Sequence, residues 1–436
     1  MIHVNRAMAI LCATFACLTG AGNAATETTL HGFQCTPDGS EPLAGLTQAP
    51  SGNLLGTTFV GGLDEAGSVF NLTPPRSGGT NWTESLPYSF EEQTEPPPVT
   101  DAVHPMGGVL LGRGGVLYGT GYYSADFGCG GGGCGAVFAL THRPSLAVQP
   151  HPSNMWHEQV VYDFLGMPDG QNPIGNLIAD NTGALYGVTT NGGAAGAGAV
   201  FKLSPPSTPG QAWTETILYS FQNQADGGFP AAGLLMDKTG ALYGTTPYSG
   251  DLGAGTVFKI TPPAHSGNPW SETVLYTFGL SGAPDDGDQP MASLIADSTG
   301  TLYGTTIFGG TQGRGAVFML TPPGGGQSNW TETTLYSFMN NGDGALPGAA
   351  LLFFKRNLYG TTEGTGGTGS YGSVFELAAP KPGVTTWPES TLYQFAGTTD
   401  GKYPVSTLIS DSAGNLYGTA EAGGPRGCGV AFEVAP

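Results

Sequence analysis

The sequence predicts an all-β protein, a seven-bladed β-propeller whose blades each contain four strands. Three observations support this: one unit recurs seven times, glycine and proline stand at fixed places within it, and the last copy lacks a final strand that residues near the amino terminus match. Repeats of this length are typical of propeller blades, and a closed ring leaves only short, protected strand edges. No stretch after residue 25 has a sustained apolar period of 3.6 residues, so we expect little helix.

Each copy contains four segments that favour strands. The clearest copy has them at 230–236, 242–246, 256–261 and 270–278, rich in Val, Thr, Tyr, Phe and Trp and bounded by Gly, Pro, Asp and Asn. One position in the second segment, usually tyrosine, marks each copy, and successive markers are 56 to 68 residues apart. In chain order the markers are Leu55, Tyr118, Tyr186, Tyr243, Tyr303, Tyr359 and Tyr417.

Tryptophan opens the fourth segment of the first six copies. These residues are Trp82, Trp156, Trp213, Trp270, Trp330 and Trp387. Because all six occupy one structural position, packing between blades explains them better than six stacking sites for a cofactor. The 74 glycines and 34 prolines recur at fixed offsets between the segments, so they indicate turns rather than disorder.

The seventh copy is divided between the two ends of the domain. Residues 396–436 contain three of the segments, and residues 25–33 match the missing fourth, with Ala25 where the other copies have tryptophan. We therefore expect one domain, 25–436, in which blade 7 consists of 396–436 together with 25–33. The amino-terminal strand would close the ring by pairing in that last blade.

Residues 1–24 have the pattern of a secretory signal peptide. Arg6 precedes an apolar run at 7–18, and the small residues Gly22 and Ala24 precede the expected cleavage site. We therefore expect an exported protein, either extracellular or periplasmic. No later apolar run approaches the roughly 18 residues that span a bilayer, so no membrane span is expected.

Four cysteines follow residue 24: Cys35, Cys129, Cys134 and Cys428. In an exported protein an even number favours disulfide bonds. Cys35 follows the closing strand and Cys428 precedes the strand beside it, so we expect these two to be bonded, with Cys129 and Cys134 forming a small clip. The alternative is a metal site, which requires convergent thiolates or a C-x-x-C spacing.

The net charge of −20 excludes some partners. Nucleic-acid binding depends on Lys and Arg that neutralise phosphate, and only 13 such residues are present against 33 Asp and Glu. Anionic membrane surfaces are excluded as partners for the same reason. The acidity favours solubility, and we expect a monomer.

The recurring order of motifs resembles a known family. Each unit runs D-G-x-x-P, L-Y-G-T-T, G-x-V-F-K-L-T-P and W-T-E-T-x-L-Y-S-F, which is similar to the Gloeo–Verruco ("GloVer") extracellular tandem repeat family over nearly all of residues 25–436. Blades 3, 4 and 5 match best; blade 2 departs at 96–101 and blade 6 at 353–357. The resemblance implies an exported protein and supplies no catalytic residues.

Most carboxylates of the repeat are interpreted as structural. A glutamate recurs in the fourth segment of every blade, at Glu27, Glu84, Glu158, Glu215, Glu272, Glu332 and Glu389. Seven equivalents indicate a solvated face or an interblade hydrogen-bonding ring rather than a pair of catalytic carboxylates. Only Asp285, Asp286 and Asp288 are dense enough to suggest calcium, and they lack the full D-x-[DN]-x-[DN]-G loop. No other cofactor is expected.

We name no catalytic residue. No G-x-S-x-G elbow occurs, and the histidines share no repeat position. His142, His151 and His157 bracket an insertion in blade 2, where exposed loop histidines and a zinc site are the two interpretations.

Binding is the favoured function. The connections between strands 4 and 1 and between strands 2 and 3 emerge on one face of a propeller, and aromatic residues interrupt the repeat there. The candidates for ligand binding are Phe59, Tyr122, Tyr123, Phe229, Tyr248, Phe308 and Tyr403. Aromatics among Asp, Asn and Gly suit a glycan or an extracellular protein, although any one of them can also be a buried loop anchor. The alternative is a polysaccharide-cleaving or lactone-opening enzyme with an off-axis site near blade 2.

Overall fold

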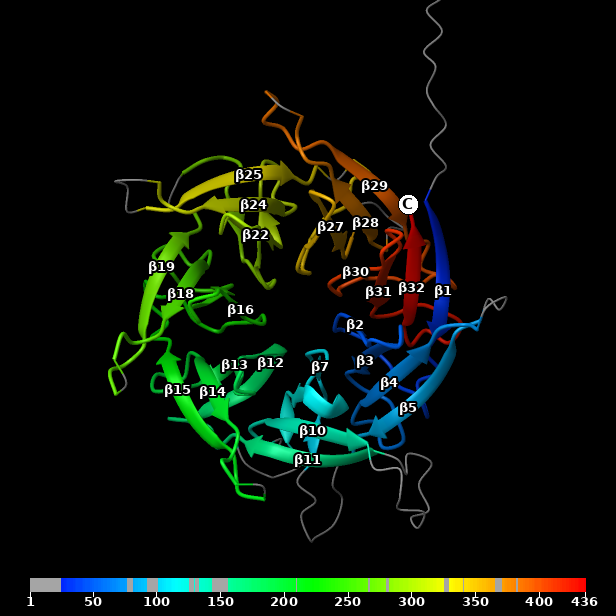
Figure 1. Ribbon diagram of the computed structural model, residues 1–436. Helices are drawn as coiled ribbons and strands as arrows, with labels where there is room; N and C mark the ends of the chain where they lie inside the picture. The colour runs from blue at the N-terminus through cyan, green and yellow to red at the C-terminus, as the bar shows by residue number, and fades with distance from the viewer. Residues whose placement is uncertain are drawn as a thin grey trace, which may run out of the picture.

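The computed structural model is a ring of seven blades around a central axis (Figure 1). The described residues are 25–76, 81–91, 101–124, 129, 133–142, 156–208, 210–265, 267–279, 282–324, 329–339, 341–364, 371–381 and 383–436. The expected signal peptide, residues 1–24, and His151 lie outside them. Each blade is one four-stranded antiparallel sheet, which confirms the predicted fold class.

Blades 1 to 3 follow one another along the chain. Blade 1 contains β2 (Thr47–Gln48), β3 (Leu54–Thr58), β4 (Ser68–Thr73) and β5 (Thr83–Ser89). Blade 2 contains β7 (Leu110–Leu111), β8 (Leu117–Gly121), β10 (Ala136–His142) and β11 (Trp156–Asp163). Blade 3 contains β12 (Gly170–Ala179), β13 (Leu185–Gly192), β14 (Ala199–Ser204) and β15 (Thr214–Ser220). The short helix η1 (Arg113–Gly115) joins β7 to β8.

The remaining blades repeat this order. Blade 4 contains β16 (Leu235–Met236), β17 (Leu242–Thr246), β18 (Thr256–Thr261) and β19 (Ser271–Thr277). Blade 5 contains β21 (Ile295–Ala296), β22 (Leu302–Thr306), β24 (Ala316–Thr321) and β25 (Thr331–Ser337). Blade 6 contains β26 (Leu352–Phe354), β27 (Asn357–Thr362), β28 (Ser373–Leu377) and β29 (Glu389–Gln394). Blade 7 contains β30 (Ile409–Ser410), β31 (Leu416–Ala420), β32 (Val430–Ala435) and β1 (Thr26–Gly32).

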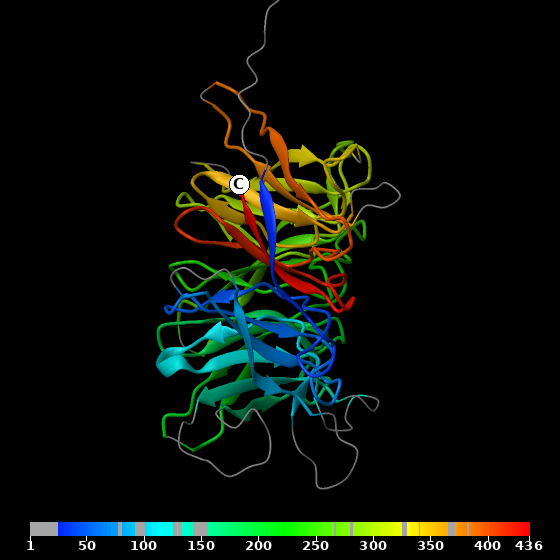
Figure 2. The same ribbon diagram turned by 90° about the vertical axis from the view of Figure 1, so that its right-hand side faces the viewer.

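The amino-terminal strand closes the ring as the sequence predicted. Strand β1 pairs antiparallel with β32, from Thr26 opposite Ala435 to Gly32 opposite Val430, and Figure 2 shows the two side by side. Cys35 and Cys428 are disulfide-bonded beside this pair, with 5.4 Å between their Cα atoms. Cys129 and Cys134 form the second predicted bond. The ends of the domain are therefore joined both by a sheet and covalently.

A buried pair of phenylalanines lies at the centre of every interblade seam. The last residue of the W-T-E-T-x-L-Y-S-F motif in one blade meets the phenylalanine of G-x-V-F in the next, edge to face, with ring centroids 4.9 to 5.2 Å apart. The pairs are Phe33–Phe70, Phe90–Phe138, Phe164–Phe201, Phe221–Phe258, Phe278–Phe318, Phe338–Phe375 and Phe395–Phe432. The glycine of L-Y-G-T-T is required because this ring covers it: a Cβ on Gly244 would lie 2.5 Å from Phe258 Cζ.

The first strand of most blades is shorter than the sequence predicted. In blade 4 only Leu235 and Met236 pair, although a strand was expected from residue 230. Near the axis neighbouring backbones approach too closely for a regular ladder, and a Cβ on Gly233 would lie 2.8 Å from Asn176 O. Carbonyls there are satisfied from the preceding blade instead, as when Thr245 Oγ1 donates to Ala292 O at 3.0 Å. The inner segments therefore hold blades together rather than extend each sheet.

The predicted seam tryptophans pack against the marker tyrosines of the preceding blade. The pairs whose rings meet at 6.0 to 6.4 Å are Tyr417–Trp82, Tyr118–Trp213, Tyr243–Trp330 and Tyr303–Trp387. In blade 4 the Tyr243 hydroxyl donates to Asp237 at 3.1 Å, and Lys259 Nζ lies 5.2 Å from the tyrosine ring centroid. Hydrogen bonds from Thr239, Ala241 and Tyr243 outweigh burial and lower the pKa of the Asp237 carboxyl. No described helix is long and apolar enough to cross a membrane.

Candidate ligand-binding rim

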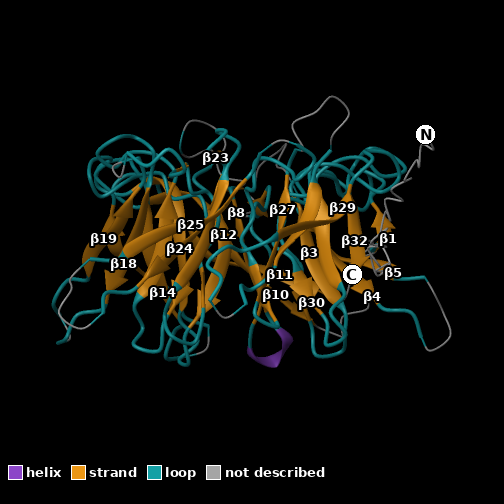
Figure 3. Cartoon of the chain, turned by 90° about the horizontal axis from the view of Figure 1, so that it is seen from above, coloured by secondary structure: helices purple, strands orange, loops and turns teal. Residues whose placement is uncertain are grey.

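One face of the ring carries a continuous rim of paired loops. The loop before strand 1 and the loop after strand 2 pair with each other in every blade, and in edge view the loops gather along two faces of the ring, with β23 on one and η1 on the other (Figure 3). In blades 2 and 5 the loops form two-stranded sheets, β6 (Ala102–Val103) with β9 (Tyr123–Ser124) and β20 (Gly287–Asp288) with β23 (Phe308–Gly309). Elsewhere they meet as Ser40–Val60, Gln171–Asn191, Gly228–Tyr248, Ala345–Gly364 and Lys402–Ala422.

The residue before the proline of D-G-x-x-P has a left-handed backbone in all seven blades. We call these residues the pre-proline ring: Glu41, His104, Asn172, Phe229, Gln289, Leu346 and Tyr403, with φ between 55° and 59°. Each backbone N–H donates to a carbonyl of the preceding blade, for example Phe229 N to Ala197 O at 2.7 Å. Glycine would relieve the conformation, yet no blade uses it, and the seven side chains are all different. Because an unfavourable backbone conformation is kept at a position whose residue differs in every blade, the side chains of the pre-proline ring are candidates for a function.

Aromatic rings of blades 1 and 2 meet on this rim. The centroids of Phe59 and His104 are 5.1 Å apart, those of His104 and Tyr123 are 5.8 Å apart, and those of Tyr122 and Tyr123 are 4.9 Å apart. His104 Nδ1 lies 3.0 Å from Phe59 O, which fixes the imidazole between the rings. Burial and the neighbouring Tyr123 raise the pKa of Tyr122, so its hydroxyl stays a hydrogen-bond donor. We call these four residues the aromatic arc.

Two amides continue the aromatic arc into blade 3. Asn172 Nδ2 donates to Tyr122 O at 3.0 Å, and Asn191 Nδ2 donates to Asn172 Oδ1 at 3.1 Å. In blade 4 the rings of Phe229 and Tyr248 lie 6.5 Å apart. Asn172 is only 5% exposed, so it holds the partly exposed Asn191 amide in place beside the rings, where that amide can hydrogen-bond to a ligand.

Carboxylates continue the rim beyond the aromatic arc, in blades 1, 7 and 6, and the two groups meet where Phe59 N donates to Glu41 O at 3.0 Å. Burial, followed by the charge of Glu421, raises the pKa of Glu363 in blade 6. Burial and Glu41 likewise raise the pKa of Glu421, which Lys402 partly opposes. Lys402 Nζ also lies 5.4 Å from the Tyr403 ring centroid. We call Glu41, Glu363 and Glu421 the acidic arc.

All seven predicted ligand-binding residues lie on this rim. Phe59, Tyr122 and Tyr123 come together and Phe229 faces Tyr248, whereas Phe308 and Tyr403 lie apart in blades 5 and 7. The side chains of Tyr123, Tyr248, Phe308 and Tyr403 are 37 to 45% exposed. Their role in binding remains a prediction. Sequence reasoning missed His104, Asn172, Asn191 and the acidic arc, although the variable residue before each repeat proline was a visible signal.

The candidate calcium residues have structural partners. Asp286 accepts hydrogen bonds from the Tyr276 hydroxyl at 3.1 Å and from Gly279 N at 2.9 Å, the arrangement that the equivalent aspartate has in other blades. Burial and the charge of Asp286 raise the pKa of Asp288. Among the described residues, no group of three His, Cys, Asp or Glu side chains is placed to hold a metal ion. Calcium binding through Asp285, Asp286 and Asp288 stays a prediction without a geometric argument.

The two described histidines of blade 2 do not converge. His142 packs on Trp156 with centroids 5.2 Å apart and is directly opposite it in the ladder. His157 is the next residue along β11, so its side chain lies on the other face of the sheet. These positions offer no support for a zinc site in the described chain.

The repeated glutamates are partly buried beside carboxylates at the seams between blades. Burial raises the pKa of Glu272 to about 7, and the charge of Asp226 in the preceding blade adds to this. The pKa values of Glu27, Glu215 and Glu332 are raised to about 7 for the same principal reason. Their equivalence around the ring matches the predicted interblade role.

The family model of the Gloeobacter/Verrucomicrobia repeat matches residues 147–297 and 270–436. No curated protein matches the chain. Among solved structures, a fungal alcohol oxidase in complex with copper is similar, with 13% identity and a TM-score of 0.52, over 95% of this chain and 76% of that one. A gluconolactonase from Xanthomonas campestris has 12% identity and a TM-score of 0.41, over 94% of this chain and 89% of that one. At these identities the likeness concerns the fold alone.

Proposed function

Because this chain belongs to the Gloeobacter/Verrucomicrobia repeat family and presents a variable rim on a regular ring, we propose that it is an exported, non-catalytic protein that binds a neutral glycan on that rim. Export is supported by the pattern of residues 1–24 and by the two disulfide bonds. Sequencing the amino terminus of the secreted protein tests this part, and a product that retains residues 1–24 would contradict it.

The aromatic arc and its amides carry the binding proposal. The faces of sugar rings stack on aromatic side chains, while their hydroxyls need donors and acceptors with fixed directions. Tyr123 and its neighbours supply ring surface, and Asn172 and Asn191 are held by hydrogen bonds to each other and to the Tyr122 carbonyl. The left-handed backbone at His104 and Asn172 orients both side chains at a conformational cost of about 1–3 kcal/mol each.

The charge of the rim selects among glycans. Glu41, Glu363 and Glu421 lie together on one side, and the whole chain carries a net charge of −20. A uronate or a sulfated sugar would be repelled there, whereas a neutral sugar would not. We therefore expect neutral glycans to bind better than anionic glycans of the same length.

A glycan fits the rim better than a protein does. The exposed aromatics Tyr123, Tyr248, Phe308 and Tyr403 belong to four different blades, so they are separated along the rim. A protein interface instead has a contiguous, well-packed apolar centre surrounded by polar residues. Spaced rings with polar residues between them suit a chain of sugar units.

The test is a glycan array with the purified protein, followed by calorimetry on the best neutral ligand. Tyr123→Ala should weaken binding by about tenfold or more, the effect of losing roughly 1.4 kcal/mol. Phe353→Ala is the matched control, because Phe353 is 40% exposed on the first hairpin of blade 6, away from the rim. Its affinity should be unchanged.

Three outcomes would overturn the proposal. They are retention of a peptide but of no glycan, equal binding by Tyr123→Ala and the unchanged protein, and hydrolysis of the glycan during the assay. The last outcome would support the alternative, an extracellular enzyme, and the first would support a protein partner.

A further inference from the structure

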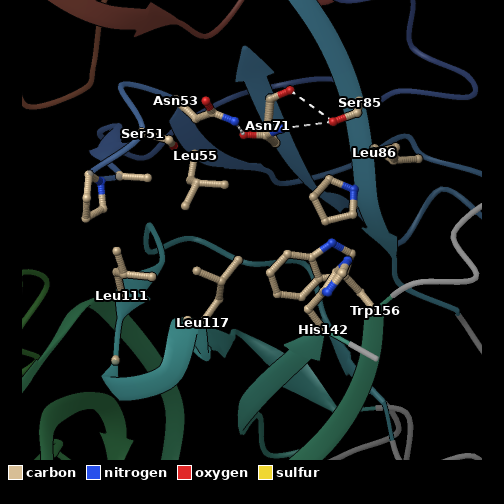
Figure 4. Close-up of a pocket in the computed structure, with 15 residues that line it drawn as sticks. Ser51, Asn53, Leu55, Asn71, Ser85, Leu86, Leu111, Leu117, His142 and Trp156 are labelled. Carbon is tan, nitrogen blue, oxygen red and sulfur yellow. Dashed lines mark hydrogen bonds between the residues drawn. The ribbon is translucent and has the colours of Figure 1, made fainter. Parts of the chain in front are cut away.

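A cavity of about 730 Å³ lies in the seam between blades 1 and 2 (Figure 4). It is bounded by the first hairpin turns of the two blades, around Ser51 and Gly115. Propeller connections of this kind emerge on the face opposite the 4–1 and 2–3 loops, where η1 lies in Figure 3. The cavity is therefore separate from the ligand-binding rim.

The cavity follows from three replacements in blade 1. Blade 4 has a tyrosine, its aspartate acceptor and a lysine over the ring at this place in the repeat. Blade 1 has Leu55, Ala49 and Asn71 at the three equivalent positions. Since donor and acceptor are replaced together, neither a hydroxyl nor a carboxylate is left buried without its partner. The seam loses a polar cluster and gains an apolar space.

The tryptophan of this seam therefore has no tyrosine beside it. Where the tyrosine is present, its ring centroid lies 6.0 to 6.4 Å from the tryptophan. In Figure 4, Leu55 lies across the space from Trp156 instead, and Leu111 and Leu117 line the side of the space to which Trp156 belongs. The corresponding cavity between blades 2 and 3, where Tyr118 packs on Trp213, measures about 280 Å³. The seam between blades 1 and 2 thus lacks an aromatic ring that other seams contain.

One wall of the cavity is polar and uncharged. Asn53 Nδ2 donates to Asn71 Oδ1 at 2.9 Å, and Asn71 Nδ2 donates to Ser85 Oγ at 3.0 Å. His142 packs on Trp156 at the far side. Among the described residues that line the cavity there is no Asp, Glu, Lys or Arg. A ligand can hydrogen-bond to the amide row without neutralising a charge.

We propose that this cavity binds a small neutral phenolic compound. The missing component of the seam is a phenol ring, and the tryptophan edge against which such a ring packs elsewhere is still present. Apolar pockets that are already formed bind aromatic molecules of matching shape because little water has to be ordered or expelled. The Asn53–Asn71–Ser85 row supplies a partner for the hydroxyl in place of the aspartate.

The probe for this site is 4-methylphenol, the tyrosine side chain as a free molecule. Calorimetry and ligand-observed NMR on the full chain should show saturable binding. Leu55→Tyr restores the missing ring and should weaken binding by about tenfold or more. Leu55→Phe fills the same space without a hydroxyl and should weaken binding equally. Two variants are used so that misfolding of one of them cannot be mistaken for loss of the site. Circular dichroism and melting curves verify that each variant is folded.

A complementary variant transfers the cavity to another seam. Asp237→Ala with Ala241→Asn, Tyr243→Leu and Lys259→Asn gives blade 4 the residues of blade 1 at these four positions, with the Thr273 hydroxyl where blade 1 has Ser85, and it should add a second equivalent of bound 4-methylphenol. The proposal is overturned by absence of binding to the unchanged chain, or by equal binding after Leu55→Tyr and Leu55→Phe. A folded blade 4 variant without a second site would also overturn it, as would preferential binding of a methyl pyranoside over the phenol.

Discussion

The seam between blades 4 and 5 and the seam between blades 1 and 2 are alike in one part and different in another. We call the fully buried part around the phenylalanine pair the inner half of a seam, and the part near the first hairpin turns the outer half. In the inner half both have a phenylalanine pair, with centroids 5.1 and 5.0 Å apart, and both have a threonine that donates to a carbonyl of the next blade, at 3.0 and 2.9 Å. In the outer half Tyr243 packs on Trp330, whereas Leu55 leaves a cavity in front of Trp156.

This difference shows which part of the repeat builds the ring. The phenylalanine pairs are fully buried and occur in every seam, so their geometry fixes how one blade meets the next. The tyrosine, aspartate and lysine of the outer half are replaced in blade 1 without loss of the sheet order. Sequence variation can therefore create a binding site in the outer half while the inner half keeps the fold.

Substitutions in the phenylalanine pairs of the inner half should lower the free energy of unfolding most, and by the same amount in both seams. Phe318→Ala and Phe138→Ala each remove one ring of a buried pair, and each should lower the free energy of unfolding by about 3–5 kcal/mol, measured by chemical denaturation. Phe353→Ala removes a partly exposed ring that stacks on Tyr303 at 6.0 Å and should cost less, about 0.5–1.5 kcal/mol. A much smaller loss for Phe138→Ala would show that the two inner halves are not equivalent.

The seam between blades 7 and 1 adds a covalent bond to the comparison. Its cysteines are 393 residues apart, whereas Cys129 and Cys134 are 5 apart. Replacing Cys35 and Cys428 together by serine should cost about 4–5 kcal/mol, because the bond restricts a very long loop in the unfolded chain. The same double replacement at Cys129 and Cys134 should cost about 2 kcal/mol or less. Thermal unfolding of both variants under non-reducing conditions measures the difference, and equal losses would contradict it.

An aspartate at this position of the outer half should stabilise blade 4 and destabilise blade 1. In blade 4, Asp237→Ala removes the acceptor of the Tyr243 hydroxyl and should cost about 1–2 kcal/mol. In blade 1, Ala49→Asp adds a carboxylate without that partner and should also destabilise, until Leu55→Tyr supplies the hydroxyl. A double-mutant cycle at 49 and 55 should give a favourable coupling of about 1 kcal/mol. A coupling near zero would mean that the two positions act independently.

The glutamates at the seams should have the smallest effect on stability, and that effect should vary gradually with pH. The glutamate pKa in the unfolded chain is near 4.5, and burial raises that of Glu332, at the seam between blades 4 and 5, to about 7, so the folded state holds the extra proton between these values. Stability should therefore fall as the pH rises from 4.5 to 7. Burial and the charge of Asp101 raise the pKa of Glu158 to about 9, so the decline at the seam between blades 1 and 2 should continue to higher pH.

Replacement by glutamine separates the two contributions. Glu332→Gln should reduce the fall of the melting temperature between pH 4.5 and 7, whereas Glu158→Gln should reduce it over the whole range from pH 4.5 to 9. Each kcal/mol regained corresponds to about 1 °C, because the entropy of unfolding grows with the length of the chain. Parallel pH profiles for the two variants would contradict the assignment of different windows to the two seams.

The repeat made the ring predictable, and its departures were harder to interpret. Period, strand order, ring closure and both cysteine pairs follow from local patterns, because strand alternation and turn residues act over a few positions. The length of the first strands could not be predicted, since it depends on how closely Gly233 approaches Asn176 in the preceding blade.

The two candidate sites differ in what the sequence revealed. The rim aromatics were visible as residues that interrupt the repeat, but the left-handed backbone at Phe229 and Tyr403 appears only in the folded chain. Leu55 was recognised as an exception among the markers. That it leaves a cavity depends on Trp156 of the next blade, about 100 residues along the chain, and on the simultaneous change at Ala49.

The pairing of β1 with β32 also has a consequence in time. Strand β1 is the first to be synthesised and the last to gain its partner, because Val430–Ala435 is made only after every other strand of the ring. Six blades can each pair their four strands in the order of synthesis, whereas the seventh must join segments separated by almost the whole chain. The ring therefore stays open until residues 428–435 have been made, and only then can Cys35 meet Cys428 and the molecule close.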